Sequence, residues 1–191
     1  MTRSLLLVAL CPVFLLSPLH AAPEVLKVGD GGFARELTFD GRSWRTTRFI
    51  SGTRSVETRS DEFHIRMMDD REWTVSDFVS EGKPVLTMQG DTSVWTVRYR
   101  WPDVVPSGAP ETVEVRYLAK PGDAVVRKNI TLSFPGEATV DRLEVERFSC
   151  KGSATRGGRG EPVFLDDRLF FGLEYPAGHS RHTDGNTPLP D

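Results

Sequence analysis

The chain has 191 residues, of which 38% are hydrophobic and 27% are charged, and its formal net charge is -3. This length and apolar content fit one globular domain with a hydrophobic core, and they exclude an intrinsically disordered chain. Because the charge balance lacks the basic excess that holds a nucleic-acid backbone, we expect no nucleic-acid partner.

The first residues have the pattern of a signal peptide. Arg3 supplies the positive n-region, residues 5–16 form the apolar h-region, and residues 19–21 (LHA) form a cleavage end. Two prolines interrupt the apolar run, which falls short of the ~20 residues that a membrane span needs. We therefore expect a signal peptide at 1–21, export to the periplasm or the extracellular space, and no membrane association after cleavage.

From Glu24 onward, hydrophobic residues alternate with a period of two, which is typical of half-buried strands. No segment carries the stripe of an amphipathic helix. Alternation is clearest where Trp95, Val97, Tyr99 and Trp101 share one face. The expected strands are 33–39, 44–50, 63–68, 73–79, 86–88, 95–101, 113–117, 123–134 and 143–148, with a bulge near 146–147.

Short strands separated by turn signals predict an all-β fold, and we expect an antiparallel β-sandwich over residues 24–178. The Gly-rich segment 149–160 is interpreted as a flexible connection. The polar residues 179–191 are interpreted as a flexible tail. After signal cleavage Cys150 is the only cysteine, so no intramolecular disulfide can form, and we expect a small, partly buried residue at a strand end rather than a reactive thiol.

Tryptophan is the residue type that would matter most for a sugar ligand, because an indole ring covers the apolar face of a pyranose. Trp95 and Trp101 keep the parity of a packing face and are expected in the core. Trp44 and Trp73 lie among polar residues. We therefore predict that these two are the freer rings and the candidate platforms.

Two carboxylate doublets suggest the acid and base pair of a glycoside hydrolase. Neighbouring residues of an extended segment point to opposite faces, however, so neither Asp69-Asp70 nor Asp166-Asp167 can flank one bond. Both doublets are predicted to lie in turns or loops. Asp166 and Asp167 remain candidate ligands for a sugar hydroxyl.

Other reactive groups give no strong signature. The segment 179–184 (HSRHTD) holds two histidines and an aspartate, but their spacing matches no metal motif. His64 alternates within a strand and is interpreted as a sheet-face residue rather than a base. Asn129 begins an N-glycosylation pattern within a strand. We identify no catalytic triad and expect no metal or other cofactor.

Three segments resemble the N-terminal β-supersandwich of family 36 α-galactosidases and related melibiase-like glycosidases, a module with the galactose mutarotase-like fold. They are YLAKPGDAVVRKNITLSF at 117–134, VDRLEV at 140–145 and EPVFLDDRLFFGLEYPAG at 161–178. The resemblance spans about residues 94–178. In those enzymes the catalytic aspartates belong to a following (β/α)₈ barrel, so the resemblance assigns no catalytic residue to this chain. It implies an incomplete sandwich and a truncated reading frame.

Our preferred hypothesis is an exported carbohydrate-binding or accessory module, whose partners are a carbohydrate and a separate glycosidase catalytic domain. The alternative is an aldose-epimerase-like enzyme that uses a histidine and a glutamate on one sheet face, as mutarotases of this fold do. His64 and Glu174 are the residues of the right types, and Glu174 is also a candidate sugar ligand. A second alternative is a truncated structural fragment that binds nothing.

Overall fold

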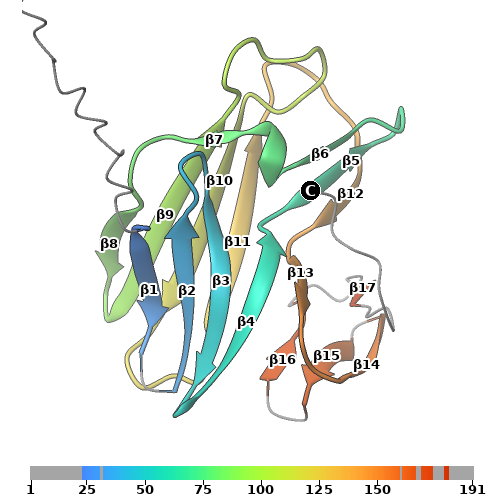
Figure 1. The fold of residues 1–191 in the computed structure, drawn as a ribbon. Helices are drawn as coiled ribbons and strands as arrows, with labels where there is room; N and C mark the ends of the chain where they lie inside the picture. Colours follow the sequence, from blue (N-terminus) through green and yellow to red (C-terminus); the bar gives the residue numbers. More distant parts are fainter. Residues whose placement is uncertain (1–22, 31, 160, 167–168, 174–178, 181–191) are drawn as a thin grey trace, which may run out of the picture.

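The protein folds as an antiparallel β-sandwich (Figure 1). The computed structural model describes residues 23–30, 32–159, 161–166, 169–173 and 179–180. The only helical element in this part of the chain is a single 3₁₀ turn at Val75–Asp77. The expectation of an all-β sandwich is therefore confirmed.

The first main sheet has the order β1-β2-β3-β4-β13 and forms the front layer in Figure 1. Its first four strands are consecutive antiparallel neighbours, and β13 returns from late in the chain to pair with β4. The strands are β1 (Val25–Gly29), β2 (Phe33–Phe39), β3 (Trp44–Ser51), β4 (Arg54–Asp61) and β13 (Arg147–Cys150).

The second main sheet lies behind the first and has the order β11-β10-β9-β7, while β8 pairs with the same edge of β9 as β7 does. Burial alternates residue by residue along β10 and along β9 from Val97 to Arg100, as the sequence predicts, whereas Val94 of β9 is buried on the other parity. The strands are β7 (Val79–Ser80), β8 (Val85–Gln89), β9 (Thr92–Arg100), β10 (Thr112–Ala119) and β11 (Val126–Ser133).

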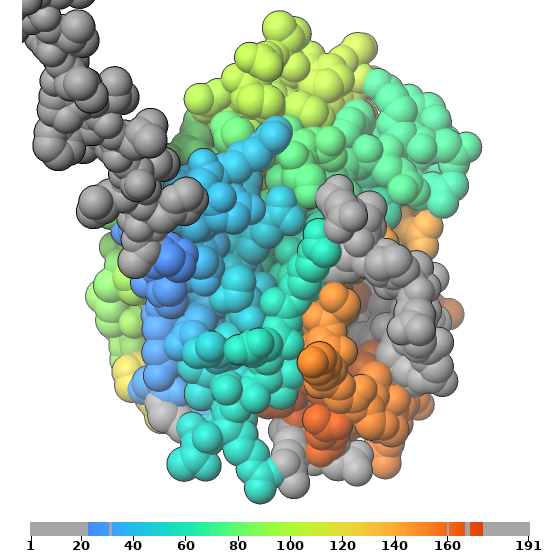
Figure 2. Space-filling model, viewed as in Figure 1, coloured from blue at the N-terminus to red at the C-terminus, as the bar shows by residue number. Residues whose placement is uncertain are grey.

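Two smaller sheets extend the sandwich. One has the order β12-β5-β6 and consists of β12 (Val140–Glu144), β5 (His64–Met67) and β6 (Glu72–Thr74). The other has the order β16-β15-β14-β17 and consists of β14 (Ala154–Arg159), β15 (Glu161–Leu165), β16 (Leu169–Phe171) and β17 (His179–Ser180). Figure 2 shows the orange C-terminal strands beside the cyan strands of the first sheet.

The main core fills the space between the two large sheets. Phe63, at its centre, is fully buried and meets Phe78 and Tyr99 edge to face, with ring centroids 5.4 and 5.3 Å apart. A second, smaller core surrounds Phe49 and joins the C-terminal strands to the first sheet. It includes Leu165, Leu169, Phe148 and Phe171.

Both β4 and β13 cross from the first sheet to the β12-β5-β6 sheet at one place. β4 ends at Asp61 and β5 begins at His64, while β12 ends at Glu144 and β13 begins at Arg147. β4 pairs with β13 and β5 pairs with β12, so the segment 54–67 and the segment 140–150 bend at the same place. The bulge predicted near 146–147 is in fact this change of sheet, and the register irregularity of β12 lies earlier, between Val140 and Arg142.

Other predictions also need correction. The expected strand 73–79 is divided, because the 3₁₀ turn at Val75–Asp77 separates β6 from β7. The segment 154–159 is strand β14 and not a flexible connection, because it pairs with β15. Residues 179–180 form β17, so the predicted tail cannot begin at 179. Strand β4 was not predicted, because its residues (RSVETRSD) are mostly polar. The predicted signal peptide at 1–21 and the residues 181–191 of the predicted tail lie outside the described residues.

Candidate functional site

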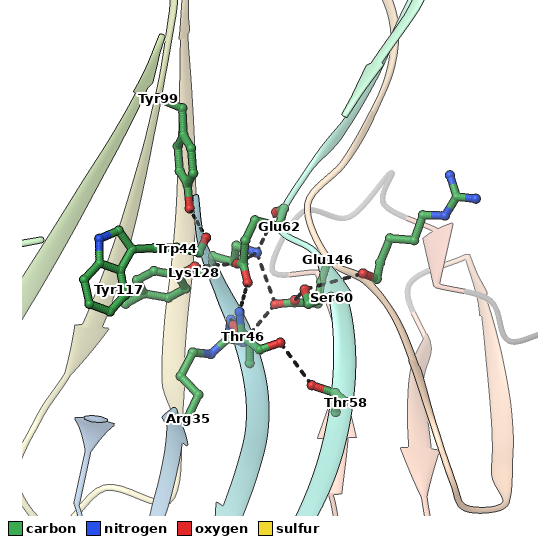
Figure 3. A network of polar contacts seen from close by, with 11 residues as sticks. Arg35, Trp44, Thr46, Thr58, Ser60, Glu62, Tyr99, Tyr117, Lys128 and Glu146 are labelled. Carbon is green, nitrogen blue, oxygen red and sulfur yellow. Dashed lines mark hydrogen bonds and ion pairs between the residues drawn. The ribbon is translucent and has the colours of Figure 1, made fainter. Parts of the chain in front are cut away.

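A network of buried charges occupies the bend between β4 and β5 (Figure 3). Glu62 is fully buried, and one of its carboxylate oxygens accepts hydrogen bonds from Lys128 Nζ at 2.8 Å and from the Tyr117 hydroxyl at 2.5 Å. Its other oxygen accepts a bond from the backbone N–H of Thr46. Lys128 Nζ also donates to the Glu62 carbonyl at 2.6 Å. Glu62 therefore joins the two large sheets.

A second ion pair continues the network toward β13. Arg35 donates to Glu146 at 2.8 Å, and Lys128 Nζ lies 3.4 Å from the same carboxylate. The Arg35 guanidinium also lies 5.1 Å from the ring centroid of Phe49 and 4.9 Å from that of Tyr117. Two positive and two negative side chains thus balance, which is the condition for burying charge at acceptable cost.

The network changes the ionisation of its members. Burial alone would raise the pKa of Glu62, but the charges of Lys128 and Arg35, with hydrogen bonds from Lys128 and Tyr117, lower it to about 2. Burial, followed by the Glu62 charge, raises the pKa of Tyr117 well above its usual value. Tyr117 thus stays a hydrogen-bond donor. Arg35 Nε is buried without a hydrogen-bond partner among the described residues, but the charged ends of all four side chains are paired. This network, closed off from solvent, suits a structural role rather than catalysis.

A second polar cluster lies on the other side of the bend, around His64. The imidazole is buried, with Nε2 at 3.2 Å from Glu72 and Nδ1 at 3.3 Å from Glu144. Nδ1 also lies 3.2 Å from Arg147 Nη1. Because an arginine side chain can only donate hydrogen bonds, neutral His64 accepts a hydrogen bond from Arg147 at Nδ1. Protonated His64 instead donates a hydrogen bond from Nδ1 to Glu144. The protonation state of His64 therefore determines whether Nδ1 pairs with Arg147 or with Glu144.

Electrostatics favour the protonated form of this imidazole. The hydrogen bond to Glu144 raises the pKa of His64, and this effect exceeds the opposing effect of burial. Neighbouring Asp61 is also buried, and burial raises its pKa against the opposing charges of Arg147 and Arg45. The side chain of Glu72 is 47% exposed, so the cluster reaches solvent on that side.

A small open depression lies at another place, where the edge of β1 meets β9. It has a volume of about 110 Å³ and is lined by the partly buried Trp95 together with Lys27, Asp30, Ser93 and Lys120. Trp95 belongs to the inner face of β9, but part of its ring stays uncovered at the border of the sandwich. One aromatic side chain is thus surrounded by hydrogen-bonding groups of both charges.

The tryptophans predicted as sugar platforms are not exposed. Trp44 is 2% exposed and Trp73 is 7% exposed, and both belong to the main core. The prediction that these two rings are freer than the others is wrong, because packing between the sheets covers them despite their polar sequence neighbours. Trp101 is buried as expected, whereas Trp95 is only partly covered.

The acidic candidates do not form one site. Asp166 lies in the turn between β15 and β16 with φ of 52°, and its carboxylate accepts a bond from the Ser153 backbone N–H at 2.8 Å. Its predicted turn position is confirmed, and its side chain ties this turn to the segment between β13 and β14. Asp167 and Glu174 lie outside the described residues.

Two further predictions concern single residues. Cys150 ends β13 and is partly buried, as expected. Burial, followed by the nearby Asp166 charge, raises the pKa of its thiol, which opposes thiolate formation. Asn129 is exposed on β11.

Sequence reasoning missed the four charged members of the buried network. Arg35, Glu62, Lys128 and Glu146 lie far apart in sequence, and Lys128 is 66 residues from Glu62. A local signal did exist, since Glu62 directly precedes Phe63, the first residue of the alternating segment 63–68. A charge in such a position is buried only with a partner.

Comparisons with known proteins identify no relative. No family model matches the chain, and no curated protein and no solved structure matches it. Within the part of the chain that the structure describes, no helix is long and apolar enough to span a membrane. Among the same residues, no group of three or more histidine, cysteine or acidic side chains is arranged to hold a metal ion.

Proposed function

We propose that this protein is an exported carbohydrate-binding or accessory β-sandwich module that serves a glycosidase catalytic domain. The observation that carries the proposal is the depression at Trp95. A partly exposed indole can cover the apolar face of a sugar ring, while nearby carboxylate, ammonium and hydroxyl groups bind its hydroxyls. Asp30, Lys120 and Ser93 provide those three groups at the same depression.

The size of the depression sets the expected affinity. A volume of about 110 Å³ is well below the ~300–1,000 Å³ of pockets that enclose a ligand. The surface therefore contacts one face of a single sugar residue and leaves the rest of a glycan in solvent. Millimolar dissociation constants are expected for monosaccharides.

A larger depression supports the proposal less well. It has a volume of about 260 Å³ and lies between the loop that follows β9 and the turn after β11. Glu137 is its only charged lining residue, and Phe134, its only aromatic one, packs against the main core. It thus offers few groups for sugar hydroxyls.

Calorimetric titration of galactosides and other glycans tests the proposal. We expect weak binding that Trp95→Ala reduces by about tenfold, since stacking on one ring supplies much of the binding free energy. Phe170→Ala is the matched control, because Phe170 is a 55% exposed aromatic residue elsewhere on the surface. The absence of binding at millimolar ligand would remove the proposal.

An aldose-epimerase-like enzyme is the second candidate, and the His64 cluster favours it. An imidazole held between two carboxylates is a group that can accept and return a proton near neutral pH. In this candidate His64 moves the proton, and Glu72 and Glu144 orient it. The role predicted for Glu174 passes to these two residues, which contact the imidazole.

Polarimetry separates the two candidates. An enzyme would accelerate sugar mutarotation above the spontaneous rate, and His64→Gln would abolish the acceleration while Trp95→Ala leaves it intact. Mutarotation at the spontaneous rate in the unmodified protein would dismiss the enzyme and leave the binding module untouched.

A further inference from the structure

Strand β8 is an open edge, and its five residues include neither the charges nor the proline that usually protect one, although Lys83 and Pro84 directly precede it. Within the described residues it pairs only with β9, and all five of its residues are exposed. Val85 is 59% exposed, Leu86 46% and Met88 58%. The strand (VLTMQ) carries no charge, although charged residues are the common protection of edge strands against pairing. In Figure 2 green atoms of this region form the left margin of the molecule, beyond the blue atoms of β1.

The hairpin geometry determines which backbone groups are free. Gln89 pairs with Thr92 across the two-residue turn Gly90-Asp91, with Gly90 at φ of 62°. The pair that closes such a turn exchanges hydrogen bonds, and hydrogen-bonded pairs then alternate along the ladder. Val85, Thr87 and Gln89 therefore direct their N–H and C=O groups toward β9. Leu86 and Met88 direct theirs toward the open edge.

We propose that β8 pairs antiparallel with β8 of a second copy of this chain, in the register that places Thr87 opposite Thr87. In this register Leu86 lies opposite Met88 of the second copy. Because both residues direct their backbone groups outward, each such pair exchanges two hydrogen bonds. Their side chains share one sheet face, so the same pairs bury the exposed apolar groups.

Charges at the two ends of β8 complement each other in the same register. Lys83 lies opposite Asp91 of the second copy, twice in the symmetric dimer. Their side chains are 76% and 64% exposed, and in the single chain they pair with Glu24 and Lys120. In the dimer these four side chains form a row of alternating charge, in the order Glu24, Lys83, Asp91 of the second copy and Lys120 of the second copy. Shifting the register by two residues in either direction places Lys83 opposite an uncharged residue, Gln89 or Ser93.

A proline substitution tests the pairing without disrupting the hairpin. We expect sedimentation or light scattering to show a monomer–dimer equilibrium between micromolar and near-millimolar protein. Met88→Pro removes an outward N–H and the Met88 side chain with its contact to Ser93, but no backbone hydrogen bond to β9. It should therefore leave the protein monomeric with an unchanged circular dichroism spectrum. A monomeric unmodified protein throughout this range, or an equally dimeric Met88→Pro variant, would overturn the proposal.

Charge reversal tests the register. Lys83→Asp and Asp91→Lys each place like charges opposite one another and should raise the dissociation constant of the dimer by about tenfold. The double variant restores opposite charges and should recover most of the affinity. If it dimerises no better than the single variants, this register is wrong. This result is independent of sugar binding, which is measured separately with Trp95→Ala.

Discussion

Glu62 and His64 are two residues apart in sequence, yet they belong to different polar clusters on either side of one bend. Glu62 is closed off from solvent among opposite charges and a phenol. His64 is buried but joined to the surface through Glu72. We therefore predict a different pH dependence of folding stability for each residue.

Replacing Glu62 with glutamine leaves Lys128 buried beside a neutral partner. Since breaking a buried ion pair leaves an uncompensated charge, Glu62→Gln should lower the free energy of unfolding by about 3–5 kcal/mol. Glu57→Gln on β4, the strand that precedes Glu62, is the control, because its side chain is 83% exposed, and it should change stability by less than ~1 kcal/mol. Urea unfolding measures both, and equal effects would contradict a structural role for the network.

The ionisation of Glu62 also sets an acid limit. Its pKa in the folded protein, about 2, lies below its ordinary value of 4.5. The contribution of ionised Glu62 to the free energy of unfolding is therefore fully present above pH 4.5 and is lost as the pH falls toward 2. The stability difference between the unmodified protein and Glu62→Gln should narrow over this range.

His64 has the opposite pH dependence. Its pKa in the folded protein is raised above the ordinary value of 6.5, so its contribution to stability is complete below pH 6.5 and is lost as the pH rises through the raised value. His64→Gln should therefore be more destabilising at about pH 5 than at about pH 9. Glu144→Gln should lower the pKa of His64, because the hydrogen bond to Glu144 is the main cause of the shift. An unshifted imidazole resonance in an NMR titration would contradict this assignment.

The predictions for single residues show that the local sequence does not determine whether a side chain is buried. Parity placed Trp95 on the inner face of its strand, and that part was correct. Whether an inner-face residue is covered depends on how far the opposite sheet extends, and here the sheet ends at β1. The inference from polar sequence neighbours failed for Trp44 and Trp73, whose burial comes from distant strands. Glu62 was missed because its partners are distant in sequence.

At the scale of elements, sequence alternation predicted the long strands but not their connections. β10 follows a strict period of two, and β9 follows it from Val97 to Arg100, because there one face lies against the core and the other is more exposed. β4 contains one apolar residue, Val56, so its alternating partial burial leaves no hydrophobic alternation in the sequence, and its last two residues are both buried where the strand enters the bend. The joint bend of β4 and β13 leaves no local sign, since it depends on pairing between residues far apart in sequence.

Two glycines of the first sheet provide a test of the β1-β2 connection. Gly29 and Gly41 have φ of 93° and 95°, so a side chain is strained equally at both. A Cβ at Gly29 would lie 2.4 Å from the Phe33 carbonyl oxygen, whereas one at Gly41 would meet nothing within 4 Å. Gly41→Ala should cost about 1–2 kcal/mol, and Gly29→Ala clearly more. Equal losses in urea unfolding would show that β1 adjusts freely at its end.

At the scale of the whole molecule, the border formed by β1, β8 and β9 concentrates the open features of the fold. The Trp95 depression lies there, and the unprotected edge of β8 lies on the same side of the second sheet. The bend holds the buried network around Glu62 and the His64 cluster, which reaches solvent at Glu72. This asymmetry suits the proposed module, in which the charged clusters at the bend stabilise the fold and the border of β1, β8 and β9 carries the proposed sugar and dimer contacts.

Indole resonances in an NMR spectrum of ¹⁵N-labelled protein test the proposed sugar binding most directly. The chain has four tryptophans, and three of them are buried controls within the same spectrum. During titration with a galactoside, the account predicts that the Trp95 indole signal moves in proportion to bound ligand while those of Trp44, Trp73 and Trp101 stay in place. A Trp95 signal that remains fixed at millimolar ligand, or movement of the buried indoles alone, would contradict it.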